Sequence, residues 1–166
     1  MTTSYAAATG RFTTGGRPHG RTALTPHIVV TPAAEAIEFY ADVLGATVGP
    51  ITCFGDVVAH AELDFGAGWL SLSDAISAYG LIAPDPAGVS YSLALYVPAV
   101  DAVVERAVRR GATLREPVQD FVSGDRYGSI LDPYGVRWSI MTRVEDISEE
   151  ESARRVDEWA ATQAGG

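Results

Sequence analysis

The sequence predicts an α+β protein made of two tandem strand-helix-strand-strand-strand units. Two helical patterns, TPAAEAIEFYADVLGA and VPAVDAVVERAVRRGA, keep a proline near their start and a Gly-Ala pair at their end in the same register. Each pattern follows one short strand-like run and precedes several others. The matched order indicates an internal duplication of about 60 to 65 residues, present in two copies.

The first unit begins with LTPHIVV, a short, apolar and β-branched run that predicts a strand. The helical pattern after it places Ala36, Ile37, Tyr40 and Leu44 on one buried stripe and ends at the following glycine. The runs ATVGPITCF, DVVAHAELDFG and GWLSLSD predict three further strands. A Gly-Ala-Gly link joins the last two as a hairpin.

The second unit follows the Pro- and Gly-containing linker AYGLIAPDPAGV. YSLALYV predicts its first strand, the second helical pattern ends at Gly111, and TLREPVQDF, DRYGSILD and VRWSIMT predict three more strands. The DPYG segment has the chemistry of a turn. Asp125 and Arg126 are expected to brace the loop before it through an ion pair.

Both ends of the chain are expected to lie outside these units. The N-terminal stretch mixes Gly, Thr and Arg without periodicity, which predicts a flexible arm. The tail has Ser148 as an N-cap with Glu151 three residues later, and its Trp159 is expected to dock the helix on the body or on a partner subunit. The predicted division is an arm over 1–21, modules over 22–82 and 83–143, and a helical tail over 144–166.

Composition excludes several functions. The formal net charge is −9, the pI is near 4.7, and all basic residues are arginine, so Schiff-base chemistry on lysine is excluded and nucleic acid is not an expected partner. A cationic ligand is permitted. A lone cysteine, Cys53, cannot form an internal disulfide, and no apolar run is long enough for a membrane span or a secretory signal. We therefore expect a cytoplasmic protein without a membrane partner.

Over residues 24–142 the duplication, with HAELDFG, WLSLSD, GDRYGSILDPYGVRWSI and then EDISEEE in that order, resembles the vicinal-oxygen-chelate superfamily of glyoxalases, bleomycin-resistance proteins and dioxygenases. The motifs look like those of its PhnB-like branch. The resemblance implies two βαβββ modules that form a curved mixed sheet around a small-molecule cleft, with the helices on the convex face. It also implies a homodimer.

In that superfamily each module typically offers one metal ligand from its first strand and one from its last. The resemblance places these positions at Thr25 and Ser71 in the first module and at Ser92 and Ser139 in the second. Hydroxyl groups are poor ligands for a divalent ion compared with imidazole or carboxylate. The usual metal centre is therefore expected to be absent, and no cofactor is assigned with confidence.

Strand alternation selects the side chains that face the cleft, because successive residues point to opposite faces. In AHAELDF the apolar positions are expected to pack on a helix, which turns His60 and Glu62 inward, and the same rule turns His27 inward from LTPHIVV. An imidazole held by a carboxylate could act as a general base, and the three could instead hold a metal at non-standard positions. A third reading is that they only bond one another or the backbone.

The remaining cleft candidates are polar or aromatic residues expected to touch a ligand. Arg137 could hold an anionic or carbonyl oxygen through its planar donors, or could pair with a nearby carboxylate. The candidate substrate-binding residues are Trp69, Ser71, Ser92, Tyr96, Arg137 and Ser139.

Two functions remain open at this point. The first is an enzyme, glyoxalase- or lyase-like or isomerase-like, that acts on an oxygenated small molecule or secondary metabolite with His27, His60 and Glu62 as its catalytic residues. The second is a non-catalytic protein that sequesters a drug or metabolite, as bleomycin-resistance proteins do, and the aromatic cleft residues suit it. The enzyme is favoured, because a passive cleft wall would tolerate apolar residues where this chain has His and Glu.

Overall fold

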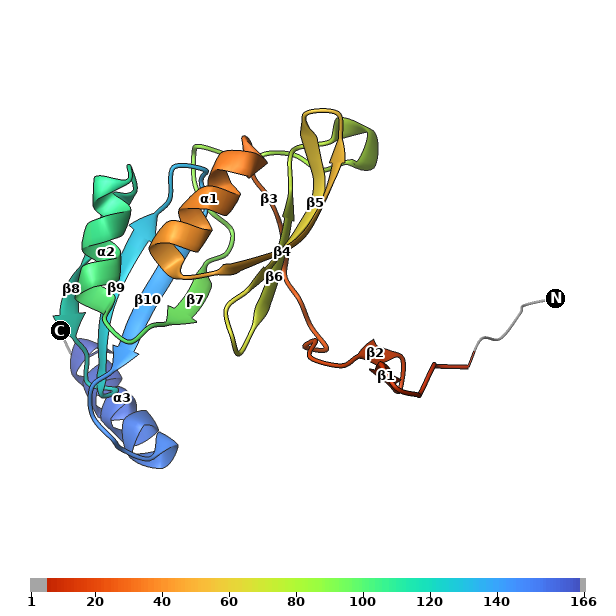
Figure 1. Cartoon of the computed structure of the whole chain (residues 1–166). Helices are drawn as coiled ribbons and strands as arrows, with labels where there is room; N and C mark the ends of the chain where they lie inside the picture. Colours follow the sequence, from red (N-terminus) through yellow and green to blue (C-terminus); the bar gives the residue numbers. More distant parts are fainter. Residues whose placement is uncertain (1–5, 165–166) are drawn as a thin grey trace.

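A computed structural model describes residues 6–164, and within them the chain forms two βαβββ modules (Figure 1). The first five residues of the predicted arm and the last two of the tail lie outside this range. The first module consists of β3 (His27–Val29), α1 (Ala33–Leu44), β4 (Thr47–Phe54), β5 (Val57–Asp64) and β6 (Trp69–Ser73). The second consists of β7 (Leu93–Tyr96), α2 (Val100–Arg109), β8 (Thr113–Asp120), β9 (Asp125–Leu131) and β10 (Arg137–Arg143). The predicted α+β duplication is confirmed.

Each module makes its own four-stranded mixed sheet. The strand orders are β3-β6-β5-β4 and β7-β10-β9-β8. In both, the first strand pairs in parallel with the last, and the remaining pairs are antiparallel. Within residues 6–164 no strand ladder joins the two sheets. Each first strand pairs inside its own module, so the curved mixed sheet implied by the resemblance consists of two four-stranded sheets, one from each module.

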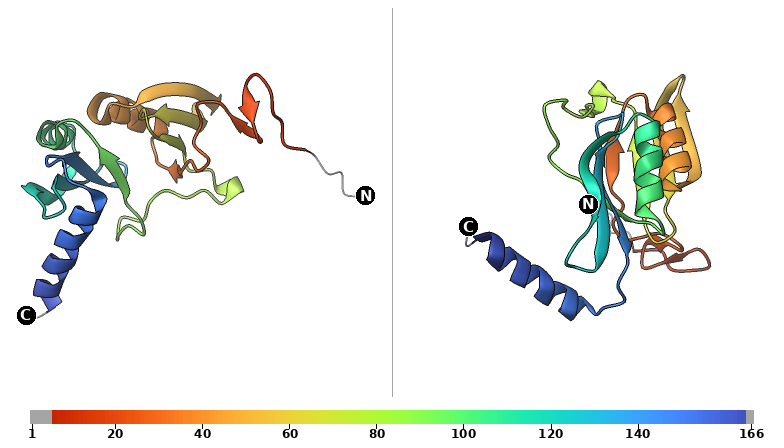
Figure 2. Two further views of the ribbon diagram at one scale, coloured as in Figure 1. Left: turned by 90° about the horizontal axis from the view of Figure 1, so that it is seen from below. Right: turned by 90° about the vertical axis from the view of Figure 1, so that its left-hand side faces the viewer.

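The helices form where the apolar spacing predicts them. Ala36, Ile37, Tyr40 and Leu44 are all buried on α1, and Gly45 ends the helix at φ 77°, a conformation that a side chain would disfavour. α1 and α2 lie side by side on one side of the molecule (Figure 2), where an Arg110–Asp42 ion pair at 2.6 Å joins them.

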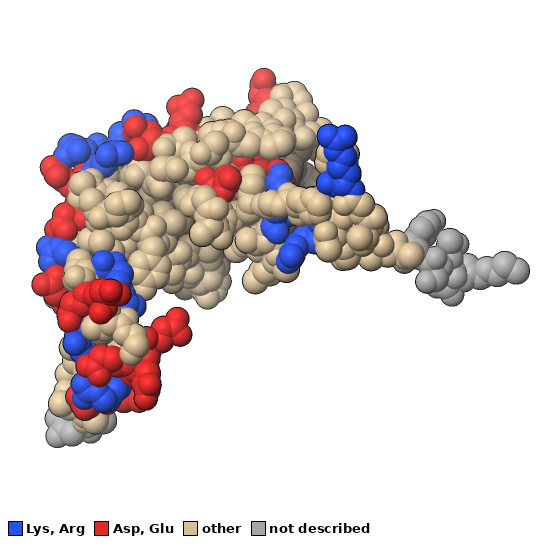
Figure 3. All heavy atoms as spheres, turned by 60° about the horizontal axis from the view of Figure 1, so that its bottom comes forward, with Lys and Arg blue, Asp and Glu red and all other residues tan. Residues whose placement is uncertain are grey.

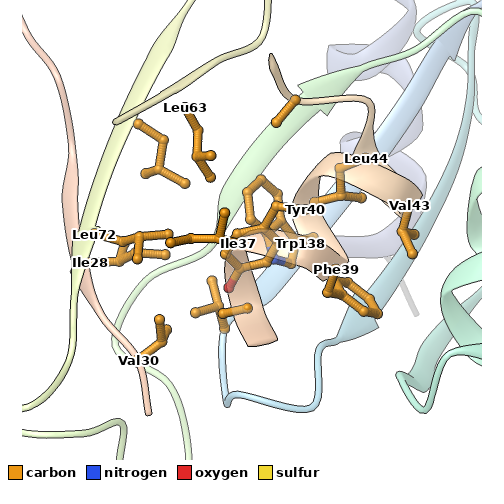
Figure 4. Close-up of a cluster of buried hydrophobic side chains, with 14 of the residues drawn as sticks. Ile28, Val30, Ile37, Phe39, Tyr40, Val43, Leu44, Leu63, Leu72 and Trp138 are labelled. Carbon is orange, nitrogen blue, oxygen red and sulfur yellow. The ribbon is translucent and has the colours of Figure 1, made fainter. Parts of the chain in front are cut away.

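Tyr40 of α1 and Trp138 of β10 lie in the apolar core (Figure 4), and a buried polar contact joins the modules there. The Tyr40 hydroxyl of α1 donates to a carboxylate oxygen of Asp132 at 2.7 Å, and the Trp138 indole N–H of β10 donates to the same oxygen at 2.9 Å. The backbone N–H groups of Tyr134 and Val136 donate to the other oxygen, both at 2.9 Å. Burial raises the pKa of Asp132, while these donors act in the opposite direction. The DPYG turn thus anchors the first module to the second.

Segments on either side of the modules project from the body (Figures 1 and 2). The N-terminal segment contains a small hairpin, β1 (Thr13–Thr14) and β2 (Arg17–Pro18), the linker between modules contains the short helix η1 (Ser77–Tyr79), and the tail forms α3 (Glu149–Ala164). None of the helices within residues 6–164 combines the length and apolarity needed to cross a membrane.

The cap and the contact predicted for α3 are confirmed. The backbone N–H of Glu151 donates to the Ser148 hydroxyl at 3.2 Å. The Trp159 ring packs edge-on against Phe121 of the same chain, with centroids 5.1 Å apart, so the helix docks on the body.

The predicted ion pair between Asp125 and Arg126 is wrong. Asp125 pairs with Arg143 at 2.8 Å, whereas Arg126 pairs with Asp101 at 2.7 Å. The two residues are neighbours on β9, and neighbouring side chains of a strand point to opposite faces.

Candidate functional site

His27 is the centre of a hydrogen-bonded chain on the first sheet. It lies opposite Ser71 in the parallel pairing of β3 with β6. Its Nδ1 is 2.9 Å from the Ser71 hydroxyl and its Nε2 is 3.3 Å from the Ser73 hydroxyl, and Ser73 in turn donates to the carbonyl of Asp74 at 3.0 Å. The Ser71 hydroxyl also lies 3.3 Å from the carbonyl of Pro26, the longer of its two contacts. A neutral ring satisfies this chain when Ser71 donates to Nδ1 rather than to that carbonyl and Nε2–H donates to Ser73. Both serines are buried, while His27 itself is exposed.

His60 lies beside His27 on the same face. The two rings stack with centroids 6.0 Å apart and an interplanar angle of 5°. Partial burial lowers the pKa of His27, and the neighbouring His60 lowers it further because two imidazolium charges repel. The side chain of His60 is 47% exposed, and its Nε2 is 3.8 Å from Glu62 Oε1. The exposed His27 ring is therefore held in its neutral form at neutral pH.

Glu62 is bound by an arginine from the segment that precedes the first module. Arg21 Nη2 is 2.5 Å from Glu62 Oε2, and the Arg21 guanidinium carbon lies 3.7 Å from the centroid of the Trp69 ring. The Trp69 indole N–H donates to the carbonyl of Gly20 at 2.9 Å. The predicted residues His27, His60, Glu62, Trp69 and Ser71 thus share one wall, and Arg21 closes one end of it.

The proposed metal alternative does not fit this geometry. Across residues 6–164 no group of three or more His, Cys, Asp or Glu side chains could hold a metal ion. Ligation needs ring nitrogens that converge on one point, whereas the rings of His27 and His60 lie face to face and both nitrogens of His27 face serine hydroxyls. Glu62 is committed to Arg21.

Strand pairing places neither Thr25 opposite Ser71 nor Ser92 opposite Ser139. Thr25 lies two residues before β3 and its hydroxyl contacts that of Thr22 at 3.3 Å, and Ser92 is exposed just before β7. Ser139 lies opposite Ala94 on β7, so the second module has an alanine where the first has a histidine beside its serine.

The second sheet carries a separate polar cluster. Arg137 Nη2 is 3.2 Å from Glu116 Oε1, Arg137 Nε donates to the Ser129 hydroxyl at 3.1 Å, and the Tyr127 hydroxyl donates to Glu116. Burial and the Glu116 carboxylate raise the pKa of Tyr127. Arg137 is therefore paired with a carboxylate, the second of the two roles predicted for it.

No hydrogen bond or ion pair within the described residues joins this cluster to the histidines. Between the modules lies a cavity of about 300 Å³, whose lining includes Trp69 and Tyr96 with Phe65, Leu95 and Trp138. Tyr96 is exposed, and its hydroxyl reaches Asp125 at 3.4 Å. A larger cavity of about 590 Å³ lies against the linker between the modules and the Arg137 end of the second sheet, away from the histidines.

Sequence patterns missed Arg21, Glu116 and Tyr127. Arg21 lies at the end of a Gly-rich, aperiodic stretch, and nothing local indicates that it folds back onto a strand forty-one residues later. Glu116 lies beside a β-bulge in β8, where simple alternation fails. A bulge cannot be read from TLREPVQDF alone.

Charge is distributed unevenly over the surface. Figure 3 shows acidic and basic side chains crowded on α3, whereas much of the central surface carries neither. The α3 charges pair with one another, as Arg154 does with Glu151 and Glu158.

Comparison with known proteins decides the family. The model of the glyoxalase/bleomycin resistance protein/dioxygenase superfamily matches residues 20–140. The chain belongs to this superfamily. An uncharacterized protein of Mycobacterium tuberculosis, Rv0887c, is 32% identical over 134 residues, which is 78% of this chain and 79% of that protein.

Solved structures share the fold. Protein PA1353 of Pseudomonas aeruginosa superposes with a TM-score of 0.60 at 23% identity, over 72% of this chain and 96% of that one. A PhnB protein of Bacillus cereus, described as a putative 3-demethylubiquinone-9 3-methyltransferase, superposes with a TM-score of 0.57 at 17% identity, over 73% of this chain and 99% of that one. At these identities the likeness extends to the fold alone.

Proposed function

We propose that the chain is an enzyme that binds an oxygen-bearing small molecule or secondary metabolite against the first module and moves a proton with His27. The observation that carries this proposal is the chain Ser71–His27–Ser73, which presents an exposed, neutral imidazole beside His60 and Glu62. A general base works best when it is unprotonated at the working pH. Membership of the superfamily, whose model matches residues 20–140, supports this proposal. We further propose that the chain belongs to the PhnB-like branch of the superfamily.

The three residues have distinct roles in this proposal. His27 removes a proton from a carbon or hydroxyl of the ligand through Nδ1, which gives up its hydrogen bond from the Ser71 hydroxyl when the ligand binds. Ser73, which accepts from Nε2–H, fixes the ring and its tautomer. His60, stacked on His27 and exposed, donates a hydrogen bond to a ligand oxygen. Such a pair of donor and acceptor suits isomerase-like or lyase-like chemistry next to a carbonyl group.

Exchange of carbon-bound protons tests this function. We would incubate the full chain in D₂O with a panel of α-hydroxy ketones and 2-oxo acids and follow loss of the α-proton signal by NMR. The expected result is exchange that His27→Gln slows by about 10²- to 10⁴-fold, the usual contribution of a general base. His19→Gln, which changes an exposed histidine of the projecting N-terminal segment, is the matched control and should retain the rate. Exchange that survives His27→Gln unchanged would contradict the proposal.

A second candidate is sequestration of a drug or metabolite without chemistry. The cavity of about 300 Å³ favours it, because aromatic side chains from both modules, Trp69, Phe65, Tyr96 and Trp138, line it. Saturable binding of a ligand with no exchange and no other conversion, seen by the same NMR measurement, would support this candidate over the enzyme.

We also propose that the chain works as a cytoplasmic homodimer. Supporting it, strand β4 at the edge of the first sheet exposes the apolar side chains Val48, Ile51 and Phe54, and β5 adds Val57. Exposed apolar edge strands favour pairing or covering. Light scattering coupled to gel filtration should give twice the chain mass, and a Phe54→Glu variant should shift it toward the monomer.

A further inference from the structure

The contacts of Arg21 describe a binding site for a cation. Its guanidinium lies 3.7 Å from the Trp69 ring centroid and 2.5 Å from a Glu62 carboxylate oxygen, an aromatic face and an anion that together recognise a positive charge. The side chains of Arg21 and Glu62 are 29% and 26% exposed, so the subsite is open to solvent on one side.

Arg21 reaches this subsite from outside the module. It lies between the projecting N-terminal hairpin and β3. The neighbouring residue Gly20 is held to the same wall by the indole N–H of Trp69, which donates to its carbonyl at 2.9 Å. Among the described residues no other arginine pairs with Glu62. The segment can thus leave without breaking a strand of either sheet.

Trp69 belongs to two features at once. Its ring makes a cation–π contact with the guanidinium of Arg21, and it lines the cavity of about 300 Å³ together with Phe65, Tyr96 and Trp138. A ligand with a cationic group on an apolar or aromatic body would match both, with its charge at Glu62 and its body in the cavity.

We propose that the first module recognises an organic cation with an apolar body, and that Arg21 is an internal competitor that occupies the cation subsite until the ligand displaces it. This inference rests on the proposed function in that it uses the same wall of the first sheet. It assigns that wall a ligand class and a gate.

Isothermal titration calorimetry on the full chain tests the proposal with benzylguanidine as the probe and benzylurea as its neutral counterpart. Arg21→Ala should bind benzylguanidine about tenfold more tightly than the wild type, a difference of about 1.4 kcal/mol. In the wild type only the molecules whose subsite is free of Arg21 can bind, so the apparent affinity is the intrinsic affinity multiplied by the fraction of such molecules. Arg21→Ala with Glu62→Gln should lose this gain, and benzylurea should bind no tighter to Arg21→Ala than to the wild type.

Two further variants control for effects other than the loss of the Arg21 charge. Arg17→Ala removes an exposed arginine of the same segment that forms no ion pair within the described residues, and it should bind like the wild type. Arg21→Gln keeps most of the side chain and should reproduce Arg21→Ala if the charge is what competes. Equal affinities of wild type and both Arg21 variants, or no binding by either variant, would overturn the proposal.

The outcomes separate this inference from the proposed function. Loss of cation binding with His27-dependent proton exchange intact would remove only the cation subsite. Cation binding that depends on Arg21 and Glu62, without any His27-dependent exchange, would leave the subsite standing and remove the enzyme.

Discussion

Ser71 and Ser139 occupy matching places in the two modules, each on the last strand and each opposite a residue of the first strand, but their surroundings differ. Ser71 is buried and bonds His27 across the parallel pair, whereas Ser139 is half-buried and faces Ala94. The duplicated fold therefore repeats the backbone pairing and not the chemistry.

The neighbouring charges differ in the same way. In the second module Arg137 forms an ion pair with Glu116, which also accepts a hydrogen bond from Tyr127. The polar groups of that cluster thus pair with one another. In the first module Glu62 lies 2.5 Å from Arg21 but 3.8 Å from His60. Its carboxylate is therefore paired with the arginine and not with the histidines. The module with the titratable, exposed rings is the one where chemistry is expected, and the other is the one where packing dominates.

The largest expected effect breaks the connection between the modules. Asp132→Ala removes the acceptor of the Tyr40 hydroxyl and the Trp138 indole and leaves these buried donors unsatisfied. It should lower the free energy of unfolding by about 3 to 5 kcal/mol, or the melting temperature by about 10 °C. Urea unfolding followed by circular dichroism measures this loss. Tyr40→Phe, which removes one hydrogen bond to Asp132, should lower the free energy of unfolding by about 1 to 2 kcal/mol. A loss under 1 kcal/mol for Asp132→Ala would show that the modules are not coupled through this carboxylate.

The next effect compares the two serines directly. Ser71→Ala deprives His27 Nδ1 of its partner at 2.9 Å and should cost about 1 to 2 kcal/mol of unfolding free energy. Ser139→Ala, without a histidine opposite it, should cost less than about 0.5 kcal/mol. The same urea titrations give both values, and equal losses would mean that the modules do not differ as described.

A smaller effect tests the closed cluster of the second module. Glu116→Gln removes the carboxylate that pairs with Arg137, both partly exposed at 43% and 35%. Exposed pairs contribute little, so the expected loss of unfolding free energy is about 0.2 to 1 kcal/mol, with proton exchange unchanged. A large loss of exchange in this variant would move the site to the second module.

The smallest effect is the pH dependence of the first module. Because the folded-state pKa of His27 lies below its usual value, the unfolded chain binds the proton more readily. The stability contribution of His27 is therefore complete above about pH 6.5, and it is lost as the pH falls through the lower folded-state pKa. Unfolding free energies at pH 7.5 and pH 5 should differ less in His27→Gln than in the wild type. The exchange rate should fall over the same acidic range, and a slope left unchanged by His27→Gln would contradict this assignment.

Much of this comparison was predictable from the sequence. The helical stripe through Ile37 and Tyr40, the helix end at Gly45 and the placement of His60 and Glu62 on the strand face opposite the buried one follow from periods of 3.6 and 2 residues. These are local rules, since each depends on residues a few positions apart. The tandem βαβββ order follows from their repetition.

The partners of those side chains could not be predicted in the same way. The sequence by itself determined where the strands and helices of the two modules lie and which face of the strand carries His27, because backbone periodicity is local. It did not indicate the hairpin of β1 and β2 in the predicted arm. Only the tertiary structure decided that His27 lies between two serines, that Arg21 returns to Glu62 and Trp69, and that the modules form separate sheets. Those contacts join residues about forty positions apart, and their geometry depends on how whole elements pack.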